Sequence, residues 1–135
     1  GMTRVPEMMG IGLNVAFGHD CVMDPWYSLG SADMLEVANM GLHVTQMTGV
    51  EQMKSCFRAV TEIPAAILGL EGYGLEKGCN ADLVILQAAD PVEALRLKAN
   101  RLFVIRRGRI ISSSAPVEAE LNLPGRPKTQ NYLFQ

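Results

Sequence analysis

The feature that most constrains the fold is a short alternating run near the start of the chain. In residues 11–18 large apolar side chains alternate with polar or small ones, the large ones being Leu13, Val15 and Phe17. Alternation with a period of two predicts a β-strand. A large apolar face opposite a small, mixed face is typical of a barrel strand, whose outer face meets helices. The same alternation predicts that Asp20 projects into the barrel mouth and that His19 points the other way.

Helical patterns dominate the rest of the first seventy residues. A short helix is expected over residues 5–9, longer ones over residues 31–47 and 51–60, and a shorter one over residues 64–69. Ser31 is the expected N-cap of the second helix, with Asp33 in its first turn, and residues 21–30 before it are expected to form a loop. Apolar residues cover most of the circumference of this second helix, which predicts packing on more than one side.

The pattern changes after residue 70, where glycines interrupt the helical periodicity. Residues 81–86 are expected to form a buried strand, and Asp90 to begin a short helix. Residues 101–105 and 109–111 flank a turn at residues 106–108 and predict a hairpin. We therefore expect a first unit over residues 1–70, a small β module over 71–115 and an irregular tail over 116–135.

Composition excludes several classes of protein. The 135 residues suffice for one domain, and a formal net charge of −2 offers no basic face for nucleic acid. No window holds about 18 consecutive apolar residues, so no membrane association is expected. No two of the three cysteines, Cys21, Cys56 and Cys79, are spaced as C-x-x-C, which argues against a disulfide scaffold and a structural zinc site. A reduced, cytoplasmic protein is the expectation.

Several motifs resemble one enzyme family. Residues 17–20 and 24–30 are similar to bacterial cytosine deaminases, which are metal-dependent amidohydrolases, and residues 62–70, 75–86 and 106–111 resemble the C-terminal signatures of that superfamily. The resemblance covers residues 2 to about 115. It implies an α/β chain that is a C-terminal fragment of a TIM-barrel amidohydrolase. Such a fragment holds the last barrel strand and helices plus strands of the small β-sandwich, because a complete barrel takes roughly 250 residues.

The resemblance also implies roles for three residues. Asp20 matches the aspartate that ends the last barrel strand. The resemblance therefore implies that Asp20 binds a divalent metal (iron or zinc), orients the metal-bound water and moves its proton. The alternative is an aspartate that caps a neighbouring backbone N–H. Trp26 matches a tryptophan of the pyrimidine pocket, the alternative being an anchor for its loop. Cys21 takes a substrate-binding position where the family usually carries a second aspartate, and a thiol cannot accept the same hydrogen bonds from a ring N–H.

The resulting hypothesis is a partial amidohydrolase whose parent reaction is hydrolytic deamination of a small, pyrimidine-like heterocyclic amine. The alternatives are a non-catalytic remnant that self-associates and an amidohydrolase acting on a cyclic amide. The chain has only two histidines, His19 and His43, and no His-x-His pair. A catalytic metal site needs about three protein ligands, so this chain alone is expected to be inactive and to bind no metal. Eight methionines and few charges predict exposed apolar surface and a homo-oligomer.

Overall fold

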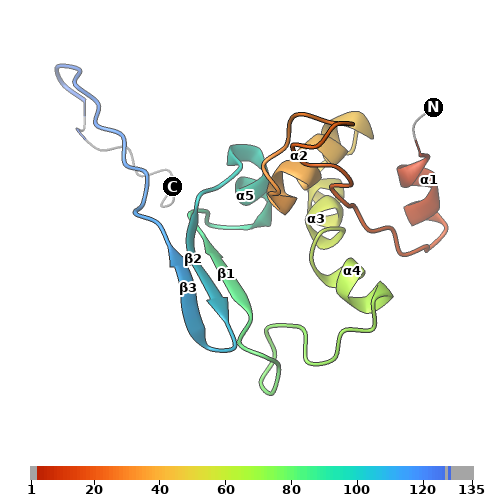
Figure 1. Cartoon of the computed structure of the whole chain (residues 1–135). Helices are drawn as coiled ribbons and strands as arrows, with labels where there is room; N and C mark the ends of the chain where they lie inside the picture. Colours follow the sequence, from red (N-terminus) through yellow and green to blue (C-terminus); the bar gives the residue numbers. More distant parts are fainter. Residues whose placement is uncertain (1–2, 127, 129–135) are drawn as a thin grey trace.

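Helices occupy the first part of the chain, and strands with one further helix among them follow, as Figure 1 shows for the computed structural model. The structure describes residues 3–126 and 128. Four helices come first: α1 (Val5–Gly10), α2 (Met34–Val44), α3 (Val50–Arg58) and α4 (Glu62–Ile67). They are followed by β1 (Leu83–Leu86), α5 (Pro91–Leu97), β2 (Arg101–Arg106) and β3 (Arg109–Ser113). The mixed α/β class, the hairpin and each predicted helix are confirmed, with ends shifted by up to three residues.

The start of α2 differs from the prediction. Asp33 is the N-cap, because its carboxylate accepts a hydrogen bond from the Leu35 N–H at 2.8 Å. Ser31 lies outside the helix, and its hydroxyl donates to the Glu36 carboxylate. Asp90 caps α5 in the same way, accepting from the Glu93 N–H at 2.8 Å, and Pro91 occupies the first turn.

The predicted strand at residues 11–18 is wrong. The segment forms no β-strand, and in the described part of the chain no strand pairs with it. A strand exists only through hydrogen bonds to a neighbour, and here the Phe17 N–H bonds instead to the Ala59 carbonyl at the end of α3, at 2.9 Å. Val15 is buried, but Leu13 is 50% exposed, so the apolar face of the alternation is covered only in part.

The three strands form an antiparallel sheet in the order β1-β2-β3. The β2–β3 turn holds Arg107 and Gly108, both with positive φ (49° and 75°), which matches the twist of a two-residue hairpin. Asp82 fixes this turn to the start of β1. Its carboxylate accepts from Arg106 Nη1 and from the Arg107 N–H, each at 2.6 Å.

One hydrophobic core joins the helices to the strand-rich half of the chain. Helices α2, α3 and α5 pack on one another, with Cys56 and Leu95 fully buried between them. The Asn39 side chain of α2 donates to the Leu95 carbonyl of α5 at 3.0 Å, and Asp33 pairs with Arg101 of β2. Helix α5 therefore packs with residues of the first unit although its sequence lies in the second. None of the described helices is long and apolar enough to cross a bilayer.

Candidate functional site

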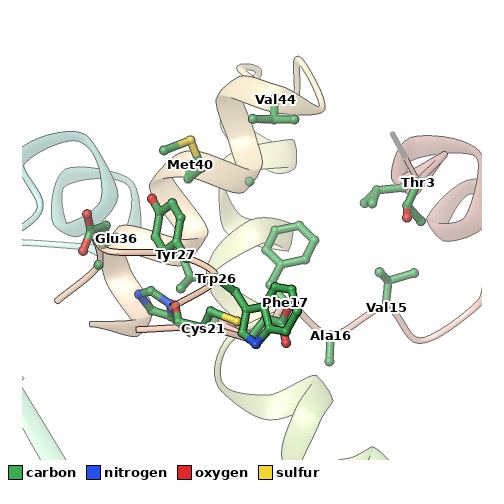
Figure 2. Close-up of a pocket in the computed structure, with 17 residues that line it drawn as sticks. Thr3, Val15, Ala16, Phe17, Cys21, Trp26, Tyr27, Glu36, Met40 and Val44 are labelled. Carbon is green, nitrogen blue, oxygen red and sulfur yellow. The ribbon is translucent and has the colours of Figure 1, made fainter. Parts of the chain in front are cut away.

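An open hollow lies between α2 and the chain that leads into it (Figure 2). It has a volume of about 640 Å³. Its lining comes mainly from residues 15–21, the loop at residues 26–30 and α2. All three residues singled out from the sequence, Asp20, Cys21 and Trp26, line it. The structure thus brings the predicted site residues to one place on the surface.

Asp20 does not continue an alternating strand. Its φ of 62° lies in the left-handed region, which glycine adopts freely and which, among L-residues, chiefly asparagine and aspartate adopt. The side chain is exposed. Because alternation holds only for extended backbone, the prediction that Asp20 and His19 point to opposite faces has no basis here, and both residues line the hollow.

The Cys21 thiol is held in its protonated form. A hydrogen bond to the Asp24 carboxylate is the largest cause that raises its pKa, followed by burial and by the charge of Asp20. A protonated thiol is a weak nucleophile and a poor metal ligand. Because its S–H bonds to Asp24, Cys21 can offer a bound molecule a small apolar surface but not a free donor.

Asp24 organises the loop, although the sequence indicated only a turn there. Its carboxylate accepts from the backbone N–H groups of Trp26 at 2.9 Å and Tyr27 at 3.0 Å. These two bonds, in that order, are the main causes that lower the Asp24 pKa, and the Cys21 bond adds to them. An aspartate followed by proline at the start of a turn is a known signature of such side-chain-to-backbone bonding and could have identified this residue.

Trp26 is 89% exposed. Its loop is closed by backbone bonds, from the Met23 N–H to the Leu29 carbonyl at 3.0 Å and from the Asp24 N–H to the Tyr27 carbonyl at 3.1 Å. The indole is therefore not a buried anchor for the loop. Figure 2 shows the indole among the side chains that line the hollow.

The two histidines differ in their surroundings. His43 is exposed on α2, whereas His19 is half-buried, with Nδ1 3.0 Å from the Cys21 carbonyl oxygen. The His19 ring also packs on Gly30: a Cβ at that position would lie 2.5 Å from His19 Cε1. Nearby, Glu36 has a lowered pKa, chiefly because the Ser31 hydroxyl donates to it. Sequence reasoning assigned no site role to His19 or Glu36.

The described residues do not fit a metal ion by themselves. Within residues 3–126 and 128, no group of three histidine, cysteine, aspartate or glutamate side chains is placed to hold one. Asp20 offers a hard oxygen donor, but the neighbouring Cys21 thiol is protonated. A catalytic site needs about three protein ligands, so the remaining ligands would have to come from residues outside this part of the chain.

Comparison with known proteins gives consistent results. A model of the Amidohydrolase family matches residues 1–113. N-isopropylammelide isopropyl amidohydrolase from Pseudomonas sp. is 32% identical over 79% of this chain and 27% of its own length. Pterin deaminase from Rhizobium rhizogenes is 31% identical over 90% of this chain and 28% of its own length.

Solved structures agree with these relatives. The crystal structure of 5-methylcytosine deaminase from Klebsiella pneumoniae liganded with 5-fluorocytosine superimposes with a TM-score of 0.83 and 36% identity. The match covers 93% of this chain and 30% of that one. The chain therefore spans between a quarter and a third of the length of these proteins.

Proposed function

The chain belongs to the amidohydrolase family, and from this we propose that it is part of an enzyme that hydrolyses a non-peptide C–N bond. The proposed reaction is deamination of a pyrimidine-like heterocycle. The relatives support this class of reaction, because two of them are named deaminases and the third an amidohydrolase. A related amidohydrolase reaction on a cyclic amide is the alternative substrate class.

The proposed place of the chain in such an enzyme is its C-terminal part. Residues 1–70 would supply the last strand and helices of a TIM barrel, residues 71–115 strands of the small β-sandwich, and residues 116–135 a tail. Two observations support this assignment. Segment 11–18 has no strand partner among the described residues, and the chain spans 30% of the 5-methylcytosine deaminase chain.

The observation that carries the proposal is the hollow that gathers Asp20, Cys21 and Trp26. An exposed indole offers a flat apolar face on which a planar heterocycle can stack. Cys21 offers the ring edge a small apolar surface but no carboxylate, because its thiol hydrogen is bonded to Asp24. Asp20 would be the single carboxylate that this chain contributes to a divalent metal, iron or zinc, in the intact parent.

Substitution of Asp20 in the intact parent tests this proposal. We expect Asp20→Ala to lower the deamination rate by orders of magnitude while the thermal unfolding midpoint stays close to that of the parent. Glu76→Ala is the matched control, because Glu76 is an exposed carboxylate outside the hollow. A rate for Asp20→Ala within a few-fold of the parent would refute the metal role.

The 135-residue chain alone should neither release ammonia from cytosine nor retain metal in a one-to-one ratio. The physical reason is that no three histidine, cysteine, aspartate or glutamate side chains among the described residues are placed to hold a metal, whereas a catalytic site needs about three ligands. Elemental analysis of the purified chain after dialysis against buffer with iron or zinc measures the second quantity. Stoichiometric metal together with turnover would contradict the expectation.

A second candidate function is a non-catalytic, self-associating module, and the surface of the chain favours it. Every residue of β3 is exposed, with Ile110 62% and Ile111 64% accessible. An edge strand with exposed apolar side chains favours pairing with another chain. We therefore propose a second copy of this chain as the partner.

Sedimentation velocity at micromolar concentration tests the self-association. We expect a dimer for the unmodified chain and a shift toward monomer for Ile110→Lys or Ile111→Lys, because a charge on an edge strand opposes pairing. Ser114→Lys is the matched control, since it adds the same charge just beyond β3. A monodisperse monomer would refute the proposed homo-oligomer and leave the enzymatic proposal unaffected.

A further inference from the structure

We propose that His19 is a positioning residue that holds Asp20 in its left-handed backbone conformation at the edge of the hollow. The imidazole does so by bonding across Asp20 to the Cys21 carbonyl and by packing on Gly30. The inference rests on the proposed function, because it gives His19 a role through Asp20. It assigns no contact between His19 and substrate or metal.

The geometry determines which ring nitrogen carries a proton. His19 Nδ1 lies 3.0 Å from the Cys21 carbonyl oxygen. A carbonyl oxygen can only accept a hydrogen bond, so Nδ1 must be the donor. In the neutral ring this leaves Nε2 without a proton, and one tautomer is fixed by the fold rather than by solvent.

The bond spans the residue with the unusual backbone. It joins the side chain of residue 19 to the carbonyl of residue 21, so Asp20 lies inside the ring that the bond closes. Asp20 has a φ of 62°, a conformation that aspartate adopts more readily than most L-residues when local hydrogen bonds support it. The hydrogen bond of His19 supplies that support, because an extended backbone at Asp20 would carry the Cys21 carbonyl away from Nδ1.

The other edge of the ring rests on the loop that carries Trp26. A Cβ at Gly30 would lie 2.5 Å from His19 Cε1 and 3.1 Å from Nε2, and Gly30 itself has a φ of 91°. Glycine is therefore required there both by its backbone and by the imidazole. The adjacent carbonyl, that of Leu29, accepts the Met23 N–H that closes the loop. His19 thus contacts the loop where it closes and constrains Asp20 at the same time.

Two NMR measurements on the unmodified 135-residue chain test the geometry. A long-range ¹H–¹⁵N correlation of the imidazole should place the proton of the neutral ring of His19 on Nδ1. The one-bond Cα–Hα coupling of Asp20 should have the reduced value that marks positive φ. A proton found on Nε2, or an Asp20 coupling typical of negative φ, would overturn the proposal.

Two variants then separate the hydrogen bond from the bulk of the ring. His19→Asn keeps an amide donor at the position of Nδ1, whereas His19→Gln moves the donor one bond further from the backbone. We expect His19→Asn to keep the reduced Asp20 coupling and His19→Gln to lose it. Amide exchange at Met23 should be about tenfold faster in His19→Gln than in His19→Asn, the size expected for one lost hydrogen bond.

His43→Gln, at the exposed histidine of α2, is the matched control and should change neither reading. Equal behaviour of the two His19 variants would overturn the proposal, because packing alone would then explain the contact. The Asp20 coupling and the Met23 amide exchange report backbone geometry and can be measured without enzymatic activity. They can therefore fail while Asp20 still proves essential in the intact parent, or hold while it does not.

Discussion

The contact between Phe17 and Gly41 determines how closely the segment 11–18 approaches α2, and its energetics can be tested directly. A Cβ added at Gly41 would lie 2.6 Å from Phe17 Cε2 and 2.8 Å from Cδ2. Carbon atoms in favourable contact lie about 3.5–4.0 Å apart. Phe17 has little freedom to retreat, because its N–H is bonded to the Ala59 carbonyl and its ring packs against the hydrophobic core.

Two opposing effects set the result of Gly41→Ala. Alanine in place of glycine within a helix is favourable by about 1 kcal/mol. Inserting a methyl group into a packed contact costs about 1–3 kcal/mol. We therefore expect Gly41→Ala to lower the free energy of unfolding by about 0–2 kcal/mol, the opposite sign from an ordinary helical glycine.

A double-mutant cycle isolates the clash. Phe17→Ala removes the ring, so in that background Gly41→Ala should stabilise the chain by about 1 kcal/mol through helix propensity alone. The coupling between the two substitutions should then be about 1–3 kcal/mol. Urea denaturation followed by circular dichroism gives all four free energies of unfolding.

Gly10→Ala in α1 is the matched control, because no atom lies within 4 Å of a Cβ built at Gly10. It should show no coupling to Phe17. A coupling near zero for Gly41, with Gly41→Ala stabilising in both backgrounds, would refute the argument that the Phe17 ring occupies the place of the missing Cβ.

The remaining predictions concern the core and the loop. Leu95→Ala should cost about 2–5 kcal/mol of unfolding free energy in urea, because this side chain is fully buried, whereas Leu97→Ala, at a residue 45% exposed, should cost clearly less. Hydrogen bonds from backbone N–H groups lower the pKa of Asp24 in the folded chain. The stabilisation that Asp24 gives the closed loop is therefore fully present above the unfolded pKa of about 3.9. It is lost as the pH falls through the lower pKa of the folded state. Fluorescence of Trp26 across an acid titration should report that loss, and Asp24→Asn should abolish the transition, whereas a transition unchanged by Asp24→Asn would contradict it.

Local patterns along the chain were sufficient to predict most of the secondary structure. The hairpin was predicted from Arg107 and Gly108, because the turn depends on the backbone preferences of adjacent residues. The helices followed from periodicity, although the cap of α2 proved to be Asp33 rather than Ser31. Gathering of Asp20, Cys21 and Trp26 at one hollow was also foreseeable, because they lie within seven residues of one another.

The tertiary structure alone decided the state of residues 11–18 and the geometry around Asp20. Alternation shows that a segment can be a strand, but a strand also needs a neighbour to accept and donate its backbone hydrogen bonds. In the described chain the Phe17 N–H bonds to the Ala59 carbonyl, the N–H groups of residues 11–13 bond back to α1, and no strand pairs with the segment. Likewise, the bond from His19 to the Cys21 carbonyl and the packing of α5 on α2 and α3 depend on how the chain returns on itself. Sequence therefore determined what each segment can form, and contacts between segments determined which of those forms is adopted.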